Sequence, residues 1–117
     1  MKVMMLILES PDDFKNRGDT PAGKEYWAAW QAYSQTISDK LVGGNILAGV
    51  EAAATLRMRG GERVVQDGPF AESKEALGGY MIFEVESMDE ALELAASCPA
   101  AATGAVELRP IVEMSAM

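Results

Sequence analysis

The sequence predicts one α+β domain over residues 1–117, in which two helices cover one face of an antiparallel sheet. Three observations lead to this class. The chain is of single-domain length, its composition of 49% apolar and 24% charged residues is that of a globular protein, and runs of strand length alternate with stretches of helical periodicity.

The first strand is expected over residues 2–8, where a continuous apolar run of strand length suits a central strand buried on both faces. The following stretch, residues 10–20, contains proline, glycine and several polar residues. An exposed loop is therefore expected there.

The first helix is expected to begin at Thr20-Pro21, because the hydroxyl can cap free amides and proline suits the first helical position. The pair Gly43-Gly44 is expected to end it. One face of this helix is apolar and aromatic at three- and four-residue spacing, and it comprises Tyr26, Trp27, Trp30, Tyr33, Ile37 and Leu41. Core packing is the ordinary interpretation of the aromatic residues, and stacking against a bound ligand is the alternative.

A β-hairpin is predicted around Gly60-Gly61, with strands over residues 55–59 and 62–66. Four further elements are expected: one or two helical turns over residues 71–77 ended by Gly78-Gly79, a strand over 80–85, a helix over 88–98 capped by Ser87 and ended by Pro99, and a last strand over 105–113 after a small-residue loop. On the last helix, Ala91, Leu92, Ala95 and Cys98 share one face.

The order of elements matches a ferredoxin-like βαββαβ unit, in which both helices lie on the same side of the sheet. The opposite face of the sheet has no helices of its own to cover it. Two such faces can bury each other, so the sequence predicts a homodimer.

Charge and cysteine content exclude several classes of protein. A net charge of −8 disfavours binding to nucleic acid or to an anionic membrane surface. The single cysteine, Cys98, cannot form an internal disulfide, and the chain opens without a secretory signal, so a cytoplasmic location is expected. Because histidine and phosphate-binding glycine motifs are absent from the sequence, we expect no cofactor and no metal.

The most distinctive motif is Asp67-Gly68-Pro69-Phe70, followed closely by Tyr80. In one interpretation Asp67 accepts hydrogen bonds within its own turn, while the proline and the phenylalanine fix and anchor the turn. In the other, the loop holds the Asp67 carboxylate at the mouth of a cleft, where partial burial lets it act as a base.

This motif, within the sequence VQDGPFAESKEALGGY, resembles the YCII-related superfamily and specifically its DGPF group. The resemblance extends from the amino-terminal KVMMLIL strand to the closing GAVELRP segment. It implies a dimeric α+β barrel of ferredoxin-like protomers. Some relatives use a His and Asp pair in a pocket, from which this chain departs because it has no histidine. Others are associated with extracytoplasmic-function sigma factors, which implies a regulatory role.

The sequence thus predicts a protein that binds a small molecule between the first helix and the sheet. If it is an enzyme, Asp67 is the expected base and Arg109 the group that stabilises a developing negative charge. For Arg109, a simple ion pair with Glu107 on the same strand face is the other interpretation. The expected ligand-binding residues are Trp27, Trp30, Tyr33, Gly68, Pro69, Phe70 and Tyr80. The alternative function is a non-catalytic regulatory module that acts through protein contacts.

Overall fold

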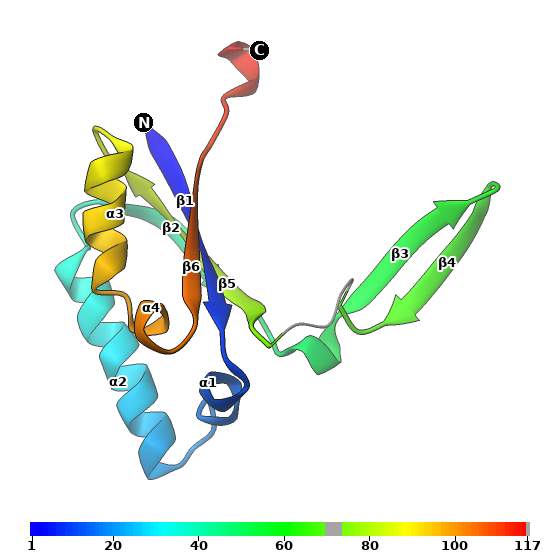
Figure 1. Ribbon diagram of the computed structural model, residues 1–117, viewed down its shortest axis with the longest axis horizontal. Helices are drawn as coiled ribbons and strands as arrows, with labels where there is room; N and C mark the ends of the chain where they lie inside the picture. Colours follow the sequence, from blue (N-terminus) through cyan, green and yellow to red (C-terminus); the bar gives the residue numbers. More distant parts are fainter. Residues whose placement is uncertain (70–73, 117) are drawn as a thin grey trace.

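The computed structural model describes residues 1–69 and 74–116, and within them the main sheet is antiparallel (Figure 1). Its strands are β1 (Lys2–Glu9), β2 (Leu41–Ile46), β5 (Ala76–Glu84) and β6 (Ala105–Pro110), in the order β2-β5-β1-β6. Helices α2 (Pro21–Thr36) and α3 (Met88–Ala96) lie on the same side of this sheet. This arrangement confirms the predicted ferredoxin-like α+β fold.

Strand β1 lies between β5 and β6, which confirms its predicted central position. Its burial alternates, however. Val3 and Met5 are fully buried on the side of the helices, whereas Met4 and Leu6 on the other side are half-buried. The expectation of burial on both faces is therefore wrong for the side without helices. The core beside Val3 and Met5 is completed by Ile7, Tyr33, Ile37, Phe83, Val85, Ala91, Ala95, Cys98 and Ala100.

Helix α2 begins as predicted, because the Thr20 hydroxyl accepts a hydrogen bond from the Gly23 amide at 3.0 Å. It ends at Thr36 and not at the glycine pair, which lies within β2. Close approach of two strands explains the second of these glycines: a Cβ added at Gly44 would lie only 2.7 Å from the carbonyl oxygen of Tyr80 on β5.

Two short helices replace expected loops. Helix α1 (Pro11–Lys15) is closed by a reciprocal pair of bonds, in which the Ser10 hydroxyl accepts from the Asp13 amide and the Asp13 carboxylate accepts from the Ser10 amide, each at 3.2 Å. Helix α4 (Pro99–Thr103) has Pro99 at its first position. Thr103 donates a 2.8 Å hydrogen bond to the buried Asp13, so the two short helices hold each other in place.

Strand β5 begins at Ala76, so Gly78-Gly79 lies inside a strand and does not end a helical turn. Residues 71–73 of that expected turn lie outside the described residues. Helix α3 is capped as predicted by Ser87, whose hydroxyl accepts from the Glu90 amide at 3.1 Å, and it ends at Ala96. Leu92 is exposed and does not share the buried face of this helix, and β6 ends at Pro110, before the predicted residue 113.

The predicted hairpin is confirmed as β3 (Ala54–Arg59) and β4 (Glu62–Asp67), which form a second sheet of their own. Gly60 and Gly61 both have positive φ, 58° and 81°, as the tightest hairpin turns require. The chain reaches the hairpin from β2 through a 3-10 turn, η1 (Val50–Ala52). Figure 1 shows the hairpin extending from one end of the main sheet, away from the helices.

Candidate functional site

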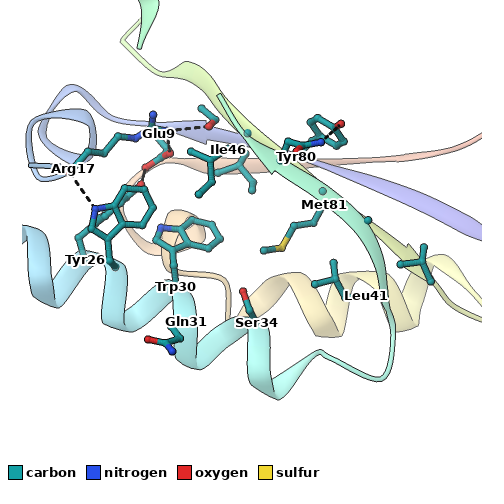
Figure 2. Close-up of a pocket in the computed structure, with 18 residues that line it drawn as sticks. Glu9, Arg17, Tyr26, Trp30, Gln31, Ser34, Leu41, Ile46, Tyr80 and Met81 are labelled. Atoms are coloured by element: carbon teal, nitrogen blue, oxygen red, sulfur yellow. Dashed lines mark hydrogen bonds and ion pairs between the residues drawn. The ribbon is translucent and has the colours of Figure 1, made fainter. Parts of the chain in front are cut away.

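A cavity of 770 Å³ lies between α2 and the edge of the main sheet formed by β2, β5 and β1. Its walls are Ile7, Glu9, Arg17, Tyr26, Trp27, Trp30, Gln31, Ser34, Leu41, Val42, Gly43, Gly44, Asn45, Ile46, Gly78, Gly79, Tyr80 and Met81. Figure 2 shows Trp30 of α2 and Met81 of β5 pointing into the same space from opposite sides. A volume of this size suits a small organic ligand.

A buried carboxylate forms the polar end of the cavity. Glu9, the last residue of β1, is only 3% exposed and accepts hydrogen bonds on both oxygens. Its Oε1 is 2.8 Å from Nη2 of Arg17, and its Oε2 accepts from the Tyr26 hydroxyl. The Arg17 guanidinium is further held by the carbonyls of Leu47 at 2.5 Å and Gly78 at 2.9 Å. These bonds fix a charged pair and a phenol in one place.

Both partners of Glu9 have shifted pKa values. Burial raises the pKa of Tyr26, and the hydrogen bond to the Glu9 carboxylate raises it further, so the phenol stays protonated at neutral pH. Burial of Arg17 opposes its charge, but the hydrogen bonds to Glu9 and Tyr26 outweigh this effect and raise its pKa. The cluster therefore presents a permanent cation and a neutral phenol donor beside a carboxylate.

Aromatic rings of α2 form the wall next to this cluster. Trp27 donates from Nε1 to the carbonyl of Arg17 at 3.0 Å, which ties the helix to the turn after α1. Its ring meets that of Tyr26 edge to face, with centroids 4.8 Å apart, and Trp30 meets Tyr33 in the same way at 6.0 Å. Since Trp27 and Trp30 are the two tryptophans of the chain, both of its indoles line this cavity.

Glycine at position 78 makes room for the charged pair. A Cβ added there would collide with Oε1 of Glu9 and would lie 2.7 Å from Nη2 of Arg17. The backbone of β5 can approach the pair closely because this residue has no side chain. Gly78 is thus part of the site through its carbonyl and through the space that it leaves.

The structure gathers some of the sequence-predicted ligand residues at the cavity and leaves others elsewhere. Trp27, Trp30 and Tyr80 line it. Tyr33 is buried behind this wall in the core, where its hydroxyl donates to the carbonyl of Leu94 at 2.7 Å. Gly68 and Pro69, which follow the hairpin, are half-buried and do not line the cavity, and Phe70 lies outside the described residues.

The two expected catalytic residues do not meet at the cavity. Asp67 is the exposed last residue of β4 in the hairpin sheet. Arg109 lies on β6 of the main sheet, with 73% of its side chain exposed and its Nε 3.9 Å from the Glu107 carboxylate. An exposed ion pair of this kind contributes little to stability. A shared catalytic role for Asp67 and Arg109 stays a prediction.

Sequence reasoning missed the three residues of the polar cluster. Glu9 did give a signal, because the alternation that places Val3, Met5 and Ile7 on the buried face also places Glu9 there. No local pattern marks Arg17, which lies in the turn after α1 and contacts residues far along the chain. Tyr26 was assigned to the aromatic face, but its hydrogen bond to Glu9 was not foreseen.

No group of three or more Cys, Asp or Glu side chains within residues 1–69 and 74–116 could hold a metal ion. None of the helices described is long and apolar enough to cross a membrane.

Comparison with known proteins places the chain in a family. A family model described as the YCII-related domain matches residues 1–115. The chain belongs to this family. The uncharacterized protein R00369 from Rhizobium meliloti (strain 1021) is 50% identical over 62 residues, which are 51% of this chain and 50% of that protein. The match thus spans about half the length of this curated relative.

The fold of this YCII-related chain is also found in a solved enzyme structure. This is 5-chloro-2-hydroxyhydroquinone dehydrochlorinase (TftG) from Burkholderia phenoliruptrix AC1100, in complex with 2,5-dihydroxybenzoquinone. The two structures align with a TM-score of 0.59 over 99% of this chain and 98% of the enzyme, at 18% sequence identity. The likeness shows the shared fold.

Proposed function

We propose that this YCII-related protein binds a small planar molecule bearing hydroxyl or carbonyl groups, in the cavity between α2 and the sheet. The observation that carries the proposal is the buried cluster of Glu9, Arg17 and Tyr26 at the end of an aromatic cavity. A few polar groups in an otherwise apolar cavity are the usual means by which a protein orients a small ligand.

The shape of the cavity favours a flat ligand. Trp27 and Trp30 supply broad aromatic surfaces on one side, and Gly43, Gly44 and Gly79 supply backbone without side chains on the other. A planar ring can lie between such surfaces, and stacking on the indoles adds to the gain from burial. TftG, the enzyme with the same fold, is seen with 2,5-dihydroxybenzoquinone, which is a reason to include that compound among the ligands tested.

Acid/base chemistry on the bound ligand is the second part of the proposal. The Glu9 carboxylate takes a proton from an acidic O–H or C–H bond of the ligand, and the electron pair of that bond stays on the ligand as an oxyanion or enolate. Once Glu9 carries the proton, the single O–H of Tyr26 turns from Glu9 to the anion and donates to it, and the positive charge of Arg17 stabilises the anion. The roles foreseen for Asp67 and Arg109 are thus proposed for Glu9 and Arg17.

Tryptophan fluorescence tests binding directly, because both indoles line the cavity. We expect saturable quenching by a compound from a panel of hydroxyquinones, phenols and keto acids. The variants Trp27→Phe and Trp30→Phe should each lose part of the signal change, and Arg109→Ala, which alters an exposed residue outside the cavity, should bind like wild type. Failure of every compound to quench, or an equal loss of binding in Arg109→Ala, would overturn the proposal.

The proton-transfer step has its own test. For a ligand that binds, we expect wild type to speed exchange of the acidic ligand hydrogen for deuterium, as followed by NMR. Glu9→Gln keeps the shape of the side chain but removes the base, so it should bind the ligand without speeding exchange. Equal exchange rates in wild type and Glu9→Gln would show that the protein binds the ligand but that Glu9 performs no acid/base chemistry on it.

We also propose that the protein is a cytoplasmic homodimer that buries the helix-free face of its main sheet. Half-buried apolar side chains, among them Met4, Leu6 and Ile82, lie on this face.

The alternative function, a non-catalytic regulatory module, is expected to have a packed protomer without a pocket. The cavity beside α2 counts against this alternative.

A further inference from the structure

The β3–β4 hairpin, here called the arm, exposes more apolar surface than an isolated hairpin in water can sustain. Leu56, Met58 and Val65 are 54%, 53% and 56% exposed. A two-stranded hairpin without a third strand or a packed helix is at best marginally stable. The arm pairs with no strand of the main sheet among the residues described. Another surface is therefore needed to cover it.

The register of the arm separates its two faces. Leu56 is opposite Val65, and Met58 is opposite Arg63, so these four side chains lie on one face. Val64 is opposite Arg57 on the other face, which also carries polar residues. Leu56, Met58 and Val65 are neighbours on a face that also carries Arg63 and Asp67, and Val64 is an isolated apolar residue on the opposite face.

The arm adjoins the helix-free face of the main sheet. In Figure 1 the helices lie on one side of that sheet, and the arm extends away from it on the other side. A molecule that covers Met4, Leu6 and Ile82 would therefore lie alongside the arm. The helix-free sheet face and the arm are thus available to the same occupant.

The distribution of charge between the arm and the rest of the chain indicates which molecule covers the arm. The arm carries three arginines, Arg57, Arg59 and Arg63, and two carboxylates, whereas the chain as a whole has a net charge of −8. The body without the arm is therefore more acidic than the whole chain. Residues 76–108 contain six acidic residues and neither lysine nor arginine. A basic arm complements an acidic body, and a second copy of the same chain supplies one.

We propose that the arm packs against a second copy of this chain, with Leu56, Met58 and Val65 on its surface and Arg63, the arginine on the same face of the arm, directed at its acidic body. The inference rests on the homodimer proposed above and extends it. In a twofold dimer the arm of each copy would pack against the other copy. The interface would then consist of the two buried sheet faces and two identical arm contacts.

The test compares two adjacent valines on opposite faces of the arm. Val65→Lys places a charge on the apolar face, and Val64→Lys places the same charge on the other face, where the valine is 45% exposed. Sedimentation equilibrium of the full chain measures the dimer dissociation constant. We expect Val65→Lys to raise it by at least about tenfold and Val64→Lys by less than about twofold.

The outcomes separate the arm from the homodimer itself. A wild type that stays monomeric at every concentration overturns both proposals. Dimeric wild type with equal dissociation constants for the two variants overturns the arm contact alone. Far-UV circular dichroism and the urea midpoint, measured on each variant, show whether the body is intact, which is expected because neither valine belongs to the core.

The dependence of dimerisation on salt tests the electrostatic part of the contact between the arm and the second copy. Raising ionic strength from about 50 to about 500 mM should weaken the wild-type dimer, because screening reduces the attraction between arm and body. Arg63→Gln, on the apolar face, should show a shallower dependence on salt, whereas Arg59→Gln, on the opposite face, should behave like wild type. An identical slope in wild type and Arg63→Gln would contradict the electrostatic part of the proposal.

Discussion

Replacing Arg17 by methionine tests the central feature of the site, the buried pair of Arg17 and Glu9. The substitution removes the 2.8 Å bond to a carboxylate that is 3% exposed, and it also leaves the carbonyls of Leu47 and Gly78 without this donor. Breaking a buried ion pair by removing one partner costs about 3–5 kcal/mol. We expect Arg17→Met to lower the free energy of unfolding by that amount, as measured by urea denaturation.

A double-mutant cycle separates the pair from the rest of the change. In Glu9→Gln/Arg17→Met no charge is left buried, so the double variant should be more stable than the sum of the two single costs predicts. A coupling free energy of about 1–3 kcal/mol is expected for residues in direct contact. Thr36→Ala, a change at the exposed end of α2, serves as a control that should add independently to either variant.

A cost below about 1 kcal/mol for Arg17→Met, or additive single changes in the cycle, would refute the role of the pair.

Three further predictions concern single residues. Gly78→Ala should destabilise the fold and abolish the quenching of tryptophan fluorescence by the ligand, because the added Cβ collides with Glu9. The control Gly18→Ala should do neither, because a Cβ added at Gly18 has no atom within 4 Å. Ser87→Ala should cost about 1 kcal/mol in urea denaturation by removing the cap of α3. Burial raises the pKa of the Cys98 thiol to about 11. The thiol of the folded protein should therefore resist a disulfide reagent at neutral pH, and it should react at once when urea unfolds the chain. Rapid labelling of the folded protein would contradict the burial of Cys98.

Local sequence signals gave correct predictions where the interacting groups are close together along the chain. Thr20 and Ser87 cap the helices that follow them, and Gly60-Gly61 forms the hairpin turn. Each of these features depends on atoms only a few residues apart, so short motifs determine them. The Ser10 capping box was equally local but was overlooked because proline and polar residues suggested a loop.

The candidate site was predicted in part. The aromatic face of the first helix gave Trp27 and Trp30, because helical periodicity places them on one side. The prediction of Asp67 rests on its distinctive motif and that of Arg109 on its place in the last strand, and neither feature carries information about distance in space. Neither residue lines the cavity.

The sequence by itself determined the class of fold, the caps at Thr20 and Ser87 and the hairpin turn, since each follows from periodicity or from neighbouring atoms. Only the tertiary structure decided that Gly43-Gly44 lies in a strand and that Arg17 joins Glu9 to the carbonyl of Gly78, 61 residues further along the chain. The physical reason is that these groups meet through strand pairing and chain reversal, which bring together residues that share no local pattern.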